Sequence, residues 1–343
     1  STQKIAVYME GHIDSDYGKM DTGVVRYLKN PIVGVIDKKL AGKQMREFMD
    51  TTKEVPILAT LKEAILKGAE VLVLGIAPSG GKIAESWNPV IEEALDNGLS
   101  IVNGLHDVLN ERWSHHIKNP LKQWIWDVRI PLFTPEIATG KASQLQNKRV
   151  LFIGTDMAVG KMTAGLELYS WLLEHKKKVG FVATGQIGIT IAGKGIPLDA
   201  FKVDHACGAV EQVVLDQADK DIILIEGQGS LLHPGSTATL PLMRGSCPTH
   251  LILCLRAEIK TLRSPEHIKI PDLNDFIALN ESLASVFGTF PRSRVIGIAA
   301  NTSMLSDNDA KAYLSKTSKD TGLVITDPIR YGIAPIGEEI LMS

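Results

Sequence analysis

A glycine-bounded loop with the spacing of a phosphate-binding site occupies residues 154–163, GTDMAVGKMT. The apolar run RVLFI precedes it, and the amphipathic run LELYSWLLEHK follows it closely. In such a strand, loop and helix, backbone N–H groups and the positive end of the helix dipole converge on one anion. The bounding glycines let the backbone curl close to the phosphates, and Lys161 supplies a positive charge. The order therefore predicts a P-loop of the Walker A kind; the alternative is a loop that binds nothing.

The loop departs from the usual pattern at Met162, which holds the position where a Ser or Thr hydroxyl binds Mg²⁺. Thr163 comes one residue later, about 100° further around a helix, so it does not simply replace that ligand. We therefore expect phosphate binding, whereas Mg²⁺-assisted cleavage of a triphosphate is disfavoured. The residues predicted to contact the phosphates are those of the loop and the first helical turn: Gly154, Thr155, Asp156, Ala158, Val159, Gly160, Lys161, Met162 and Thr163.

Composition bounds the classes of protein to which the chain can belong. Its 343 residues suggest two domains, since one domain usually takes about 100–200 residues. The net charge of −2 and the pI near 6.5 lack the basic excess of a nucleic-acid or membrane-surface binder. No apolar run approaches the roughly 18 residues that would span a bilayer, and the first residues show no signal-peptide pattern. We therefore expect a cytoplasmic protein with no nucleic-acid and no membrane partner.

The cysteines and histidines predict neither a disulfide framework nor a metal site. Cys207, Cys247 and Cys254 are widely spaced and match no zinc pattern. His115 and His116 have no carboxylate pattern near them and are interpreted as surface residues. No group of histidines and cysteines has metal-ligand spacing, so we expect no bound metal.

The first 115 residues alternate between apolar runs and helical patterns. The runs are nearly continuous in Val, Ile and Leu, as in parallel strands buried on both faces, and stand at 4–10, 31–37, 55–58, 70–77 and 100–104. Helices are predicted at 61–68 and 88–98. Ligand loops should follow the strands, at Gly11, Gly18, Gly23 and 78–82. The spacing G-x-G-x-x-G is absent, which disfavours a nicotinamide-dependent dehydrogenase.

A segment rich in proline and polar residues, 128–148, predicts the boundary between a Rossmann-like domain at 1–138 and a P-loop NTPase-like domain at 139–343. The second domain repeats the alternation. Its strands are predicted at 149–153, 176–185, 221–227, 250–256, 294–301 and 323–328, with helices at 272–287 and 306–319. The fold class is therefore α/β, with two doubly wound domains and a mainly parallel sheet.

Glu226 stands where the apolar strand DIILIEG gives way to glycines, at the sheet edge that also carries the P-loop. A carboxylate there could act as a general base or hold a metal, or it could only shape the turn. The polar stretch 228–250 that follows predicts a long binding loop. Within it, His233 could move protons and Arg244 could bind a substrate carboxylate; the alternatives are a structural histidine and a surface salt bridge. Cys247 is interpreted as a packed residue.

The glycine-rich stretch 183–201 predicts a backbone lining for a small ligand, with a mobile connection as the alternative. Asp204 and His205 could form an acid–base pair, although adjacent residues seldom face the same way. Together with the glycines after Glu226, the two stretches supply the candidate substrate contacts: Gln186, Gly227, Gln228, Gly229 and Arg244.

Two resemblances can now be stated. GTDMAVGK and IEGQGS resemble the P-loop and the strand-end acidic segment of dethiobiotin synthetase. The larger set GTDMAVGKMT, ATGQIGI, IEGQGSLLHPG, RGSCP, GIAANTS and VITDPIR resembles a family long known only as a domain of unknown function, some of whose members are connected with D-glutamate N-acetyltransferase activity. This second resemblance covers the whole second domain, and the family's Rossmann-like N-terminal domain matches residues 1–140 more loosely.

The second resemblance implies acetyl transfer from acetyl-CoA to the amine of an acidic amino acid similar to D-glutamate. The P-loop would then bind phosphates of CoA, Glu226 or His233 would act as base, the amides of Gly227–Gly229 would stabilise the oxyanion, and Arg244 would bind the carboxylates. One alternative is a ligase or carboxylase like dethiobiotin synthetase that uses ATP with Mg²⁺, and another is a nucleotide- or CoA-binding module without catalysis. The partner would be a small-molecule amino acid substrate, and two α/β domains favour a homo-oligomer.

Overall fold

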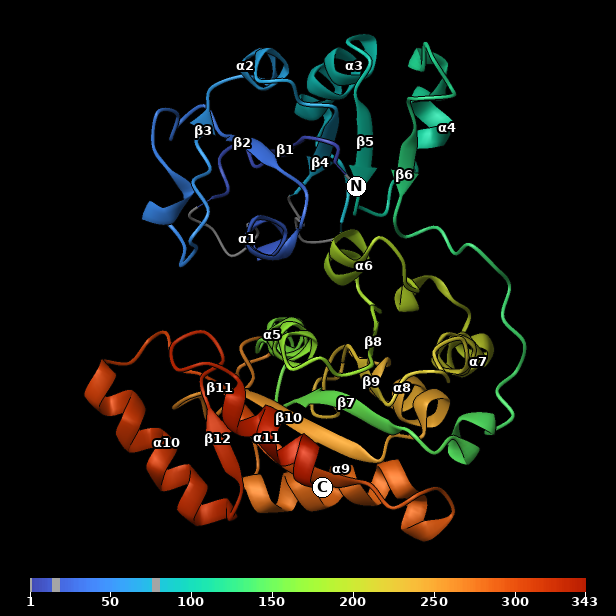
Figure 1. The fold of residues 1–343 in the computed structure, drawn as a ribbon, viewed down its shortest axis with the longest axis vertical. Helices are drawn as coiled ribbons and strands as arrows, with labels where there is room; N and C mark the ends of the chain where they lie inside the picture. The colour runs from blue at the N-terminus through green and yellow to red at the C-terminus, as the bar shows by residue number, and fades with distance from the viewer. Residues whose placement is uncertain (1, 14–18, 76–80) are drawn as a thin grey trace. The chain divides into compact units, whose positions relative to one another are not determined.

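The computed structural model describes residues 2–13, 19–75 and 81–343 (Figure 1). Contacts between residues divide the chain into two units, Ser1–Pro131 with Gln186–Pro197 and Leu132–Gly185 with Leu198–Ser343. Each unit contains a parallel sheet with helices, which confirms the predicted fold class. The boundary expected after residue 138 stays a prediction. Gly18 and residues 78–80, expected in ligand loops, lie outside the described residues.

The sheet of the first unit has six parallel strands in the order β3-β2-β1-β4-β5-β6. This is the strand order of the Rossmann dinucleotide-binding fold, in which the direction of winding reverses between β1 and β4. The five strands predicted for this unit are present, with ends that differ by a few residues, while the short β6 was not predicted. The strands are β1 (Ile5–Tyr8), β2 (Ile32–Ile36), β3 (Ile57–Leu58), β4 (Val71–Leu74), β5 (Ser100–Asn103) and β6 (Ile125–Asp127).

The helices of the first unit are α1 (Lys19–Tyr27), α2 (Leu61–Leu66), α3 (Asn88–Asp96), α4 (Leu109–Trp113) and α6 (Gln186–Ala192). One core joins the sheet to α2, α3 and α4, through residues such as Leu72, Ile91 and Trp113. The Thr60 hydroxyl caps α2 by accepting from Glu63 N–H. The fifth helix, α6, packs against α1. It lies in the stretch 183–201, for which no helix was predicted; the expected backbone lining for a ligand stays a prediction.

The sheet of the second unit also has six parallel strands, in the order β12-β11-β10-β7-β9-β8. All six were predicted. Its central strands are long and almost fully buried because both faces are covered by helices. The strands are β7 (Lys148–Gly154), β8 (Val179–Val182), β9 (Ile222–Ile225), β10 (His250–Arg256), β11 (Arg294–Asn301) and β12 (Val324–Thr326).

The helices of the second unit are α5 (Lys161–Glu174), α7 (Val203–Leu215), α8 (Thr239–Ser246), α9 (Leu273–Ser285), α10 (Asp307–Thr321) and α11 (Ala334–Met342). The Asp272 and Ser306 side chains cap α9 and α10, whose predicted positions are confirmed within two residues. The stretch 228–250 is not the structureless loop that was expected, since α8 forms within it. Asp204 and His205 lie in the first turn of α7, where His205 Nδ1 bonds Pro135 O at 2.7 Å.

Candidate phosphate-binding site of the second unit

The predicted P-loop connects the carboxyl end of β7 to the start of α5 (Figure 1). Gly160 caps α5 in a left-handed conformation, with φ 101°, which a side chain rarely adopts. At Gly154, a Cβ atom would lie 2.8 Å from Val159 Cγ2 and 2.9 Å from Lys161 Nζ. A side chain at this position would displace Val159 and Lys161, so a glycine lets the loop fold closely around the lysine. This compact backbone at a helix N-terminus fits a phosphate group.

Lys161 is buried, with only 6% of its surface exposed, and its Nζ donates to Asp156 O at 2.9 Å. Burial lowers the pKa of Lys161 to about 8, although Cys254, Asp156 and Glu226 oppose the shift. A bound anion would favour the charged form and raise this pKa again. Met162 and Thr163 lie half-buried in the first turn of α5.

Gly227 brings the acidic segment against the P-loop strand. A Cβ on Gly227 would lie 1.6 Å from Phe152 O and 3.0 Å from Lys161 Cδ, so no side chain fits there. The end of β9 can therefore pass directly beside β7 and the lysine. This close approach places Glu226, the preceding residue, next to the P-loop, as the shared sheet edge predicted.

Glu226 is 3% exposed, and its Oε2 accepts from Thr184 N–H at 2.8 Å and from Gly185 N–H at 3.2 Å. Burial raises the pKa of Glu226 to about 7, while the two amides and Lys161 oppose the shift. Burial is the dominant cause because it penalises the charged form. A carboxyl group that titrates near neutral pH can both accept and return a proton, which is what a general base requires.

The glycines around Glu226 also hold Gln228 and the following turn in place. A Cβ on Gly185 would lie 2.4 Å from Gln228 Nε2 and 3.4 Å from Glu226 Oε1. Gly229 has φ +64° and packs on Ser236, where a Cβ would meet Oγ at 1.6 Å. Three predicted substrate contacts, at positions 227, 228 and 229, therefore lie beside the predicted base.

Asp156 links the P-loop to the segment 260–270, here called the flap. Its Oδ1 accepts from Met157 N–H at 2.6 Å, and its Oδ2 accepts from Arg263 N–H at 2.9 Å. The flap folds back on itself through Leu262 N–H to Ile268 O and Ile270 N–H to Lys260 O, both 2.9 Å. Both carboxylate oxygens thus hold backbone, so Asp156 shapes the loop.

His233 also contacts the flap, through Nε2 to Ser264 O at 2.6 Å. Its Nδ1 accepts from Gly235 N–H at 3.1 Å, so the proton of the neutral ring lies on Nε2. Both ring nitrogens are used within the protein. Proton transfer through His233 would have to break one of these bonds, whereas Glu226 is under no such constraint.

One of the predicted substrate residues, Arg244, does not join this group. Arg244 lies in the last turn of α8, where Nη1 donates to Leu283 O at 2.8 Å and the guanidinium lies 5.5 Å from the Phe290 ring. The next residues of α8 bond to Arg149 at the amino end of β7, the edge opposite the P-loop. Arg244 is therefore not placed to bind a substrate carboxylate there. Gln186 directly follows Gly185 and begins α6, and its contact with a substrate stays a prediction.

Thr184 and Gly185 belong to the stretch 183–201, which was predicted to line a small ligand with its backbone, but their bonds to Glu226 were not predicted. Sequence reasoning missed Cys254 as a residue of this site. Cys254 lies in β10, fully buried and close enough to Lys161 to affect its pKa, and burial raises the pKa of the thiol to about 12. Its inward orientation has no local signal in the sequence.

Within the described part of the chain, no group of three or more His, Cys, Asp or Glu side chains could hold a metal ion. In the same residues, no helix is long and apolar enough to cross a membrane.

The fold and the site define a two-unit α/β protein with a Rossmann-like first unit and a P-loop second unit. Family models match both units: a domain of unknown function, DUF1611_C, described as a P-loop domain, over residues 136–337, and DUF1611_N, a Rossmann-like domain, over residues 38–131. The chain belongs to the DUF1611 family, which confirms the family resemblance described above.

Similar proteins align with this chain over most of their lengths. A protein of Pseudoalteromonas sp named D-glutamate N-acetyltransferase is 37% identical over 80% of this chain and 82% of its own. A protein of Tritonibacter scottomollicae with the same name is 36% identical over 80% and 81%. The crystal structure of a DUF1611 family protein from Anabaena variabilis superposes with a TM-score of 0.95 at 41% identity, covering 99% of this chain and all of that one.

Proposed function

We propose that the chain is a D-glutamate N-acetyltransferase that uses acetyl-CoA, with phosphates of the donor held by residues 154–163. The observation that carries this proposal is the name of the two relatives at 36–37% identity, which align over 80% of the chain. The geometry agrees with it, because the glycine-lined loop and Lys161 suit an anionic group. Met162 in place of a hydroxyl suits a phosphate that is bound and not cleaved.

Acetyl-CoA would supply an activated thioester carbonyl. The amine of the amino acid would add to its carbon to form the oxyanion, and the bond to sulfur would then break, so that CoA leaves as a thiolate and takes up the proton removed from the amine. The ammonium group of the substrate must first lose a proton, and Glu226 is the candidate acceptor. The Thr184 and Gly185 amides orient its carboxylate. Backbone N–H groups of residues 227–229 and the Gln228 side chain would donate to the developing oxyanion, since they surround the base.

The experiment is to incubate the purified protein with acetyl-CoA and D-glutamate, with L-glutamate as the matched acceptor, and to follow free CoA and the acetylated product by mass spectrometry. We expect N-acetyl-D-glutamate and CoA in equal amounts without added Mg²⁺, with little product from the L-isomer. Lys161→Ala should raise KM for acetyl-CoA. Formation of ADP from ATP with Mg²⁺, and no acetylated product, would instead favour the dethiobiotin synthetase-like alternative.

A further inference from the structure

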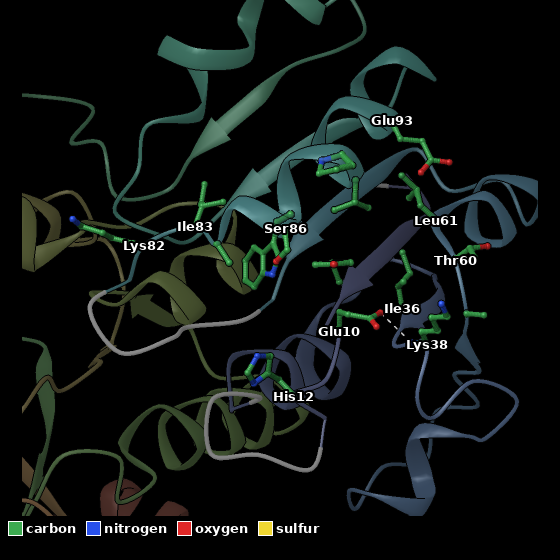
Figure 2. A pocket seen from close by; sticks show the side chains of 16 residues that line it. Glu10, His12, Ile36, Lys38, Thr60, Leu61, Lys82, Ile83, Ser86 and Glu93 are labelled. Atoms are coloured by element: carbon green, nitrogen blue, oxygen red, sulfur yellow. Dashed lines mark hydrogen bonds between the residues drawn. The ribbon is translucent and has the colours of Figure 1, made fainter.

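The first unit contains a cavity of about 970 Å³ at the carboxyl ends of its strands (Figure 2). Its walls come from the residues at and after the ends of β1, β2 and β3 and from residues within 82–93, which include the first turns of α3. In sheets of this strand order, ligands bind outside the carboxyl ends of the strands, where the winding reverses. The volume lies at the upper end of the roughly 300–1,000 Å³ typical of small-molecule sites, and far exceeds that of one amino acid.

One residue that lines the cavity, Tyr8, can donate a hydrogen bond into it. Tyr8 is 7% exposed and lines the cavity, and its ring packs edge-on against Trp87 at 5.5 Å. Its hydroxyl bonds to none of the residues that the structure describes. Burial, with Glu10 and Asp37 nearby, raises the pKa of Tyr8 to about 12, so the hydroxyl keeps its proton. The hydroxyl is not among the fully enclosed polar atoms that lack a partner, so a ligand or water in the cavity can accept from it.

Charged groups of both signs stand beside this donor. Glu10 Oε2 accepts from the backbone N–H of Lys38 at 3.0 Å, and Figure 2 shows the carboxylate directed toward Lys38. The neighbouring carboxylate of Asp37 accepts hydrogen bonds from the backbone N–H groups of Gly11, Lys39 and Leu40. In dinucleotide sites, the acid that follows β2 accepts a hydrogen bond from a ligand hydroxyl. Because Asp37 already accepts from three amides, we assign this role to Glu10.

The remaining lining supplies the other contacts that a nucleoside needs. The apolar side chains of Ile36, Leu61 and Val90 offer a surface for a flat base, and Ser86 offers a hydroxyl. The exposed ammonium group of Lys38 can pair with a phosphate. Lys82 also lines the cavity, but its side chain points away from the others in Figure 2.

From this combination we propose that the first unit binds a phosphorylated nucleoside, with its sugar hydroxyls between Tyr8 and Glu10 and its phosphate at Lys38. This site is distinct from the P-loop of the second unit and does not depend on the acetyl transfer proposed above. Two sources share the chemistry: a free nucleotide such as ADP, and the adenosine phosphate end of a second CoA molecule, in addition to the one proposed at the P-loop. The lack of a G-x-G-x-x-G loop argues for one nucleoside and against a dinucleotide.

The test is calorimetric titration of the full chain with ADP and, separately, with CoA. Lys161→Ala removes the P-loop charge, so the affinity of the first-unit site should change less than about twofold in that variant. In the same background, Tyr8→Phe and Glu10→Gln should each weaken binding by about three- to tenfold, the value of one hydrogen bond. The matched control Lys62→Ala changes an exposed lysine of α2 outside the lining and should leave binding unchanged.

If CoA binds and ADP does not, the ligand of this site is CoA. If both bind, the site also accepts free nucleotides. The proposal is overturned if Lys161→Ala abolishes all binding, or if Tyr8→Phe and Glu10→Gln bind as tightly as their parent. Circular dichroism of each variant separates lost binding from lost folding. Retained binding together with absent acetyl transfer would refute the proposed function and leave this site standing.

Discussion

The residue pair with the most direct consequence for activity is Glu226 and Lys161, whose pKa values are shifted toward neutrality by burial to about 7 and about 8. If Glu226 is the base, kcat/KM should rise with pH through about 7 as its carboxyl ionises, and fall above about 8 as Lys161 loses the charge that holds phosphate. The measurement is a pH–rate profile between pH 5.5 and about 9.5. A flat profile would contradict the assignment.

Glu226→Gln should lower kcat by about 100- to 10,000-fold, the usual contribution of a positioned general base. It should also remove the rise of kcat/KM with pH near 7. The Gln side chain retains an oxygen for the Thr184 and Gly185 amides, so the fold should persist. Glu174→Gln, an exposed substitution at the end of α5, is the control. Unchanged turnover in Glu226→Gln would remove this residue from the mechanism.

The same shift predicts a pH-dependent stability. Folding raises the pKa of Glu226 from 4.5 to about 7, so its contribution to stability is complete below 4.5 and is lost as the pH rises through about 7. Glu226→Gln does not titrate. The melting temperature of the variant, relative to the natural chain, should therefore increase between pH 5 and about 8, as measured by scanning calorimetry. A constant difference would show that the carboxyl is not perturbed.

Among the elements, the flap is hydrogen-bonded to the P-loop through the side chain of Asp156. Asp156→Ala removes the acceptor for Arg263 N–H and Met157 N–H. We expect faster amide hydrogen exchange over residues 260–270, with little change in β7, whose own hydrogen bonds are intact. Asp219→Ala, at an exposed ion pair, is the matched control. Equal exchange of the flap in both variants would mean that Asp156 does not hold it.

At the opposite edge of the same sheet, Arg149 joins β7 to the end of α8. It is fully buried, and its guanidinium donates to the carbonyls of Ser246, Cys247, Leu145 and Asn147. Arg149→Met would leave several buried carbonyls without donors, at about 1–3 kcal/mol each. Denaturant unfolding should show a loss of about 3 kcal/mol or more, and a loss below about 1 kcal/mol would show that water replaces the donors.

The elements differ in how well the sequence predicts them. Both sheets could be predicted because their strands are continuous apolar runs, a signal carried by each segment alone. Glu226 and Gly227 could be placed beside Lys161 because parallel strands end at one sheet edge. The helix α8 was not predicted because TLPLMRGS contains a proline and a glycine. The position of Arg244 was therefore wrong, since it lies in the last turn of this helix, near the amino ends of the strands and away from the P-loop. The role of Asp156 depends on a residue 107 positions away, which no local pattern reports.

At the scale of the whole molecule, α6 is the least expected feature. Its sequence, QIGITIA, follows a strand of the second unit, yet contacts assign it to the first. Ile189 is 2% exposed, so Ile189→Ala should cost about 2–4 kcal/mol. The first unit holds four of the five tryptophans, so tryptophan fluorescence reports mainly on its unfolding. The unfolding transition followed in this way should move to lower denaturant concentration in Ile189→Ala. Ile340→Ala in α11 is the control for the second unit, and an equal response of both variants would contradict the assignment.

The route of the chain, which leaves the second unit at Gln186 and returns to it at Leu198, has a consequence for biosynthesis. When Pro131 has emerged from the ribosome, α6 has not yet been synthesised or has not yet emerged. The amino-terminal unit is therefore incomplete until about 66 further residues, up to Pro197, have emerged. During that interval the P-loop strand and its helix are already outside the tunnel. Maturation of the two halves is thus interleaved in time, and gene truncation at a single point cannot separate them cleanly.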